Sequence, residues 1–140
     1  MAINFAVVDG ITDTIIGAAI KVHRALGPGL FESAYQRCLV FELKRTPRKT
    51  VAKQRLPLIY EGERVGPGYE SDVIVDDLVV VEVKSVRQLA PIHTAQILTY
   101  MKLTGCPAGL LLNFNVPVMK QGIRRLLNGK ATKGIIEDPA

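Results

Sequence analysis

The sequence has 140 residues, enough for one globular domain with a substantial core, and 48% of them are hydrophobic. This composition excludes an intrinsically disordered chain, and no apolar run approaches the length of a membrane-spanning helix. The formal net charge of +5 favours a polyanionic partner but does not identify one.

Localisation and cysteine chemistry follow from the same inspection. The N-terminus has no basic segment followed by an apolar run, so a signal peptide is not indicated and a cytoplasmic location is expected. Cys38 and Cys106 form neither a CxxC pair nor a zinc-binding spacing. We expect both to be buried free thiols.

Two helices are predicted in the first third of the chain. Apolar residues recur at helical spacing from Ile11 to Leu26, and Gly27-Pro28-Gly29 ends this helix. A second helix is predicted from Phe31 to Arg45, and Pro47 prevents its continuation. The basic segment 44–55 that follows is most simply a solvated loop, with a phosphate-contacting surface as the second interpretation.

The rest of the chain alternates strands and helices. Strands are predicted at Arg55–Tyr60, Tyr69–Val75, Val79–Lys84 and Ala108–Phe114, and helices at Pro91–Thr104 and Val118–Leu127. Such an order indicates an α/β protein with a mixed sheet of four or slightly more strands, in which the helix at 91–104 joins two parallel strands. We expect a single domain over residues 1–128 and a flexible C-terminal tail over residues 129–140.

Three charged residues on the central strands carry the strongest chemical signal. Val79–Val83 is otherwise apolar, which predicts a buried strand, yet it contains Glu82 and is followed by Lys84. These two residues are two positions apart and therefore share a face. Together with Asp72 on the preceding strand, they could hold a divalent cation and a water beside a phosphodiester, which suits metal-assisted hydrolysis.

The turn between these strands decides whether the two acids can meet. A two-residue turn at Asp76-Asp77 would place Asp72 and Glu82 on opposite faces of the sheet. A three-residue loop, Asp76–Leu78, would place Asp72 directly across from Glu82, so the catalytic interpretation requires this loop or a bulge. The alternative is an Asp that caps a turn and a Glu–Lys pair at a sheet edge, and the strand pattern alone favours it.

Polar residues on two helices are further candidates. His93, Gln96 and Tyr100 are spaced i, i+3 and i+7, so they form one stripe that could orient a water or a phosphate. Glu32 lies in the first turn of the second helix and is a candidate metal ligand or water-orienting base. In each case a structural role is the simpler alternative: a partly exposed polar face, or an acid favoured by the helix dipole.

Several motifs resemble those of a known protein family. Gly29-Leu30-Phe31-Glu32-Ser33-Ala34-Tyr35 matches the G-x-x-E-x-x-Y signature of the GxxExxY proteins. The segments 22–30, 91–100 and 112–117 are also similar to that family, so the resemblance extends from about Ile11 to Leu127. The family is placed in the PD-(D/E)xK nuclease-like superfamily, which implies a restriction-endonuclease-like core.

The resemblance assigns roles residue by residue. Asp72 corresponds to the first acid of the superfamily motif, and Glu82 and Lys84 to its E-x-K. Gln96 through Tyr100 is similar to the Q-x-x-x-Y of RecB-type exonucleases, and Glu32 corresponds to the acid of the upstream helix. Ser71 stands where the motif name has proline, and the link 45–53 is unlike the usual one.

These correspondences imply a nuclease that depends on Mg²⁺ or Mn²⁺ and acts on nucleic acid, with DNA as the expected substrate. Asp72 and Glu82 would bind the metal, with the carbonyl of Val83 and the carboxylate of Glu32 as further ligands. The alternatives are a non-catalytic nucleic-acid-binding or regulatory module with the same fold, and a subunit that needs a partner for activity. The chain has no separate recognition domain, so a homodimer or a protein partner is a reasonable expectation.

Overall fold

The structure, a computed structural model, describes residues 4–128 and 135–139. Its elements are, in chain order, α1 (Phe5–Leu26), α2 (Glu32–Lys44), β1 (Thr50–Tyr60), β2 (Glu63–Val75), β3 (Val79–Lys84), α3 (Pro91–Thr104), β4 (Ala108–Asn113), the 3-10 helix η1 (Met119–Gly122), β5 (Ile123–Asn128) and β6 (Ile135–Pro139). The six strands form one sheet in the order β1-β2-β3-β4-β5-β6. β3 and β4 run parallel, and the other neighbouring pairs run antiparallel.

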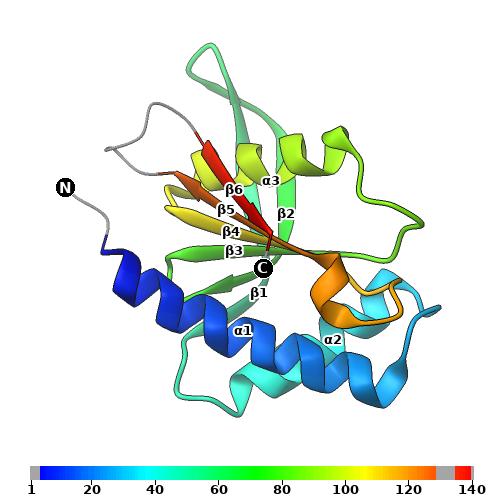
Figure 1. Cartoon of the computed structure of the whole chain (residues 1–140). Helices are drawn as coiled ribbons and strands as arrows, with labels where there is room; N and C mark the ends of the chain where they lie inside the picture. The colour runs from blue at the N-terminus through cyan, green and yellow to red at the C-terminus, as the bar shows by residue number, and fades with distance from the viewer. Residues whose placement is uncertain (1–3, 129–134, 140) are drawn as a thin grey trace.

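The helices cover both faces of this sheet. α1 and α2 lie on one face, and α3 lies on the other (Figure 1). α3 connects β3 to β4 as the predicted crossover between parallel strands. The arrangement confirms the α/β class and the mixed sheet flanked by helices, with two strands beyond the minimum of four.

The helix ends follow local chemistry. α1 begins before Ile11 because the side chain of Asn4 accepts hydrogen bonds from the backbone N–H groups of Ala6 and Val7, at 3.1 and 3.4 Å. It ends at Leu26, as predicted, with Gly27 at a φ of 67°. The bounds predicted for α3 are also confirmed, and Gly105 closes that helix in the left-handed conformation.

The first two strands are longer than predicted. β1 begins at Thr50, so the second half of the basic segment 44–55 is strand and not loop. β2 begins at Glu63, and the hairpin of β1 and β2 projects beyond the rest of the sheet (Figure 1). Sequence patterning missed the start of β2 because the projecting part has little core to cover and therefore shows no regular alternation of apolar residues. The missed start of β1 instead pairs with residues 71–75 in the body of the sheet, and there Lys53 departs from regular strand geometry with a φ of 52°.

The helix predicted at Val118–Leu127 is wrong. A short 3-10 helix, η1, is followed by strand β5, which pairs antiparallel with β4. Ile123 and Leu127 face α1 and α2, whereas Leu126 faces α3, so the apolar residues serve both faces with a period of two. A helix over the same residues would leave the edge of β4 without its partner strand.

The predicted tail is partly described. Residues 135–139 form β6, which pairs with β5. Residues 129–134 and 140 lie outside the described residues. Among the described residues, no helix combines the length and the apolar character that crossing a bilayer requires.

Candidate active site

The loop between β2 and β3 sets the position of the candidate acids. Val75 pairs with Val79, and Val73 pairs with Val81, so three residues, Asp76–Leu78, separate the strands. Continuing this register by one residue brings Asp72 opposite Glu82. The three-residue loop that the catalytic interpretation requires is therefore present.

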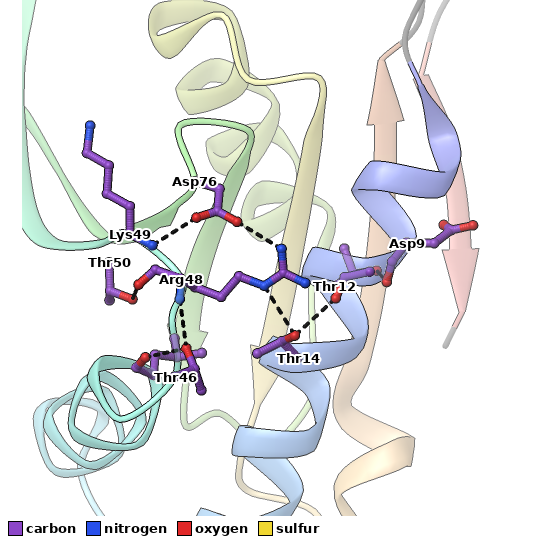
Figure 2. Close-up of polar contacts among 10 residues, drawn as sticks. Asp9, Thr12, Thr14, Thr46, Arg48, Lys49, Thr50 and Asp76 are labelled. Carbon is purple, nitrogen blue, oxygen red and sulfur yellow. Dashed lines mark hydrogen bonds and ion pairs between the residues drawn. The ribbon is translucent and has the colours of Figure 1, made fainter.

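Polar contacts hold this loop in place. Asp76 and Asp77 adopt left-handed backbone conformations, with φ values of 52° and 56°. One carboxylate oxygen of Asp76 accepts from Arg48 at 3.0 Å and the other from the Lys49 backbone N–H at 2.8 Å (Figure 2). The Arg48 guanidinium also donates to the hydroxyl of Thr14 on α1, at 3.4 Å (Figure 2). The loop is thus tied both to α1 and to the segment that precedes β1.

The two acids lie on the face of the sheet that α3 covers. Val80 and Ile74 pack beneath α3, and Glu82 and Asp72 are each two residues away on the same strands. The Val83 backbone N–H donates to a carboxylate oxygen of Asp72 at 2.7 Å. The Asp72 N–H donates to a carboxylate oxygen of Glu82, with a longer separation of 3.4 Å. Beyond the Val73–Val81 pair, the strands are therefore bridged through carboxylates.

Burial makes two neighbouring negative charges costly here. Glu82 is only 4% exposed, and burial followed by the negative charge of Asp72 raises its pKa to about 9. Burial also raises the pKa of Asp72, although the hydrogen bond from Val83 opposes that shift. The positive charge of Lys84 acts against both shifts. Without a cation, the pair therefore retains a proton at neutral pH.

This pair satisfies part of what a divalent cation needs. A cation between Asp72 and Glu82 would take the place of the retained proton and remove the repulsion between two charged carboxylates. No group of three or more His, Cys, Asp or Glu side chains is arranged to hold a metal ion among the residues the structure describes. Two carboxylates are chemically compatible with a hard divalent cation whose remaining ligands are backbone and water oxygens.

Glu32 lies at the end of β3, beside the acids. Its carboxylate accepts a hydrogen bond from the Ser85 backbone N–H at 3.0 Å, immediately after Lys84. The hydroxyl of Ser85 donates to the Leu30 carbonyl at 2.6 Å. The negative charge of Glu32 contributes to the raised pKa of Asp72, which places the two carboxylates in one electrostatic environment. Glu32 joins α2 to the strand that carries Glu82 and Lys84.

The tyrosine of the G-x-x-E-x-x-Y signature has a structural task. Tyr35 is fully buried, and its ring stacks on Phe114 with centroids 4.5 Å apart. Its hydroxyl donates to the Gly27 carbonyl and accepts from the Leu30 N–H. Gly29 supplies a φ of 102° in the same loop. The signature thus fixes the loop that leads into Glu32.

Two buried amides that sequence reasoning missed support the site. The Gln36 amide donates to the Asp72 carbonyl at 3.1 Å. Asn113, at the end of β4, accepts from the Val86 N–H at 3.1 Å and donates to the Val86 carbonyl at 3.0 Å. The available signal was a polar residue inside an apolar pattern in each case: Gln36 follows the buried Tyr35, and Asn113 ends a run of buried residues.

The predicted stripe on α3 separates into three different environments. Tyr100 is half-buried, and its pKa is raised by burial and then by the negative charges of Glu82 and Asp72. Gln96 is exposed one turn away and makes no hydrogen bond within the described part of the chain. His93 accepts a hydrogen bond from the Ala90 N–H at 2.9 Å and so caps α3. The structure brings Tyr100 to the acids and gives His93 a structural role.

The sequence model of the PD-(D/E)XK nuclease superfamily matches residues 9–126. The mixed sheet flanked by helices is consistent with a restriction-endonuclease-like fold. No curated protein and no solved structure matches the chain.

Proposed function

Because this chain belongs to the PD-(D/E)XK nuclease superfamily, we propose that it is a divalent-metal-dependent nuclease that hydrolyses phosphodiester bonds in DNA. The observation that carries the proposal is the position of Asp72 beside Glu82 on one sheet face, where the Asp72 N–H donates to the Glu82 carboxylate and Lys84 follows two residues further along β3. We retain the narrower GxxExxY resemblance as part of this proposal.

The acids would form the metal site. Asp72 and Glu82 would bind Mg²⁺ or Mn²⁺ through their carboxylates, with the Val83 carbonyl as a third protein ligand. When bound, such a cation acidifies water and neutralises charge on the phosphate. Glu82 must give up the proton that burial and Asp72 hold on it at neutral pH. Loading of the site therefore releases a proton and improves as the pH rises.

The remaining residues would handle the substrate. The Lys84 ammonium, on the same face of β3 as Glu82, would position the attacking water and donate hydrogen bonds to the phosphate as its charge grows. Tyr100 and Gln96 on α3 would orient the substrate strand. Glu32 would hold a second cation or a water, and its bond to the Ser85 N–H keeps the end of β3 in place. No histidine base is needed in this scheme.

A nuclease panel tests the proposal. The wild-type protein should cleave at least one member of a set of single-stranded, duplex, nicked and branched DNA in Mn²⁺, and Lys84→Ala should slow cleavage by about 100-fold or more, as expected for loss of a group that stabilises transition-state charge. Lys21→Ala is the matched control, because Lys21 is exposed on α1 and its ion pair, within the described part of the chain, is with Glu42 of α2.

Each outcome of the panel decides a point. Equal cleavage by the wild type and Lys84→Ala would place the activity elsewhere or in a contaminant. Binding of Mn²⁺ and DNA without cleavage of any substrate would favour the non-catalytic nucleic-acid-binding module. RNA versions of the same substrates would show whether the 2′-hydroxyl changes the result.

A further inference from the structure

Two tyrosine rings meet at the border of the candidate site. Tyr69 lies on β2, three residues before Asp72, and Tyr100 lies on α3. Their ring centroids are 5.7 Å apart, and the ring planes are tilted by 60°. The pair therefore connects the strand that carries one acid to the helix that covers both acids.

The pair is partly open to solvent. Tyr69 is 44% exposed, and Tyr100 is half-buried. Neither ring belongs to the fully buried cores, although Tyr100 packs against the edge of the cluster beneath α3. Tyr100 packs against the cluster that contains Ile74 and Val80, and Asp72 and Glu82 are each two residues away on the same strands, so the exposed aromatic surface adjoins the acids. A nucleotide whose phosphate lay at the acids would have its base or sugar near these rings.

The backbone around Tyr69 is constrained. Tyr69 pairs across the hairpin with Leu56, which is only 4% exposed. Gly68 precedes it with a φ of 77°, and a Cβ atom on Gly68 would lie 1.6 Å from the Leu56 carbonyl oxygen. This close approach requires glycine and fixes the strand just before Tyr69. Tyr69 is therefore an exposed aromatic residue held on a rigid element, which limits the entropy lost on binding a flat ligand.

The charge of the hairpin argues against a surface that follows phosphates. Residues 50–75 contain three cations, Lys53, Arg55 and Arg64, and four acids, Glu61, Glu63, Glu70 and Asp72. A strand or hairpin that binds duplex nucleic acid through its phosphates needs a clear excess of cations. Stacking on an aromatic ring needs no such excess, but it needs a base whose face is not covered by its neighbours.

We propose that Tyr69 and Tyr100 form a stacking platform for an unpaired nucleobase next to the phosphate held at Asp72 and Glu82, so that the preferred substrate is single-stranded DNA. The inference rests on the proposed function, since it places the phosphate at the acids. Tyr69 is then a residue that determines substrate form, and the acids determine the chemistry.

The test measures binding separately from hydrolysis. Fluorescence anisotropy would give the affinity of the protein for a labelled single strand and for a duplex of the same sequence, in Ca²⁺ under conditions where no cleavage is detected. Tyr69→Ala should weaken single-strand binding about tenfold, in line with the loss of one stacked base, and leave duplex binding unchanged. Tyr69→Phe should bind like the wild type because it keeps the ring.

Two controls keep the result specific. Tyr60→Ala removes another tyrosine of the same hairpin, which is 64% exposed and makes no ring contact in the described structure, and it should leave both affinities unchanged. A set of single strands with one abasic position moved along the sequence should include one that weakens wild-type binding but not Tyr69→Ala binding. That non-additivity would identify the base on the platform, and it requires only that both proteins melt at similar temperatures.

The contrary outcomes are distinct. The platform is overturned if Tyr69→Ala weakens single strand and duplex equally, if Tyr60→Ala has the same effect, if no abasic position matters, or if the wild type binds no nucleic acid. Cleavage by the wild type together with any of these results leaves the nuclease proposal intact. If an abasic position weakens single-strand binding but no substrate is cleaved, the stacking platform is supported and the nuclease proposal is rejected.

Discussion

The two faces of the sheet bury different kinds of side chain. On the face toward α1 and α2, β2, β3 and β4 contribute apolar residues that pack with Tyr35 and Leu39 in one buried cluster. On the face toward α3, the same strands contribute a smaller apolar cluster and then Asp72, Glu82 and Lys84. Among the described residues, the buried cluster on the first face is made of apolar side chains, whereas the second face desolvates two acids.

This difference shows how one strand can serve both stability and chemistry. β3 alternates between the faces, so Val81 and Val83 enter the larger core, while Glu82 and Lys84 face α3. The cost of burying Glu82 is offset by packing on the other side of the same backbone. Stability and function should therefore be separable by mutation, and the following predictions test that separation.

Asp72→Asn should have the largest effect on function. It should abolish Mn²⁺ binding and cleavage, while leaving the metal-free protein folded and equally or slightly more stable, because it removes a buried acid whose ionised form is penalised by burial and keeps an acceptor for the Val83 N–H. Thermal melts with and without Mn²⁺ measure this: the cation should raise the wild-type melting temperature and leave the variant unmoved.

Glu70→Gln is the matched control for Asp72→Asn, since Glu70 is an exposed acid on the same strand. It should retain the Mn²⁺ shift. An equal Mn²⁺ shift in Asp72→Asn and the wild type would show that the cation binds elsewhere. A variant that cannot fold would make Asp72 a structural residue and favour the binding-module alternative.

Leu39→Ala should lower stability and leave function unchanged, which is the opposite of Asp72→Asn. Leu39 is fully buried between α2 and the sheet, so its truncation should lower the free energy of unfolding by about 2–5 kcal/mol. Mn²⁺ affinity and cleavage per folded molecule should not change. Urea denaturation measures the first quantity and cleavage at low temperature the second. Leu103→Ala, at a 44% exposed position on α3, should be far milder in unfolding.

The pH dependence of stability should identify Glu82. Its pKa is raised to about 9 in the folded protein from an ordinary value of 4.5, so between these pH values the folded state binds more protons than the unfolded state. This contribution to stability is fully present below about pH 4.5 and is lost as the pH rises toward 9. The melting temperature of the metal-free protein should fall over that range, and less steeply in Glu82→Gln.

Mn²⁺ should counteract this loss because it stabilises the charged form of Glu82. Melts from pH 5 to pH 9, with and without Mn²⁺, make the comparison. The melting temperature of the metal-free wild type could instead change with pH in the same way as that of Glu82→Gln. Glu82 would then be ionised in the metal-free protein, and the face toward α3 would tolerate two negative charges.

Asp76→Asn should produce the smallest but most local effect. It weakens the contacts with Arg48 and Lys49 that hold the three-residue loop, while asparagine still tolerates the left-handed backbone. We expect a loss of about 1–2 kcal/mol in the free energy of unfolding. Asp77→Asn, which weakens only an exposed pair with Lys49, should cost less than about 0.5 kcal/mol. Chemical denaturation of both variants measures the difference.

The cleavage activity of Asp76→Asn tests whether the loop contacts also position the two acids. If the loop contacts fix the register that opposes Asp72 and Glu82, activity per folded molecule should fall in Asp76→Asn and not in Asp77→Asn. Loss of stability at Asp76 without loss of activity would show that the Val73–Val81 and Val75–Val79 pairs fix the register by themselves.

The sequence predicted those parts of the molecule in which local pattern and tertiary packing agree. Val79–Lys84 is an apolar run bounded by turn residues, and Pro91–Thr104 begins with proline and ends at glycine, so both were located within their observed bounds. The position of Asp72 relative to Glu82 could be narrowed to two loop lengths, because strand alternation permits only two outcomes. The charges of Asp76 and Asp77 could not indicate which loop would form.

The misses are contacts between distant segments. Ile123–Asn128 suits a helix as well as a strand, and pairing with β4 decides the matter. Gln36 meets the Asp72 carbonyl, and Tyr69 meets Tyr100, across separations that no local pattern encodes. The roles of Gln96 and Glu32 stay predictions, because they depend on a substrate and a cation.

The hydrogen bonds of the site also differ greatly in sequence separation, with a consequence for the order of folding. Asp72 and Val83 are 11 residues apart, so their bond closes with a local hairpin, which forms on a timescale of about 1–10 μs. Glu32 and Ser85 are 53 residues apart, so their bond must wait for α2 to dock. Asp72 and Glu82 should therefore come together while the hairpin is still exposed to water. At that stage burial does not yet oppose the ionisation of their carboxyl groups. Pulse-labelled amide exchange should show the Val83 N–H protected before the Ser85 N–H; simultaneous protection would mean that the site forms in a single cooperative step.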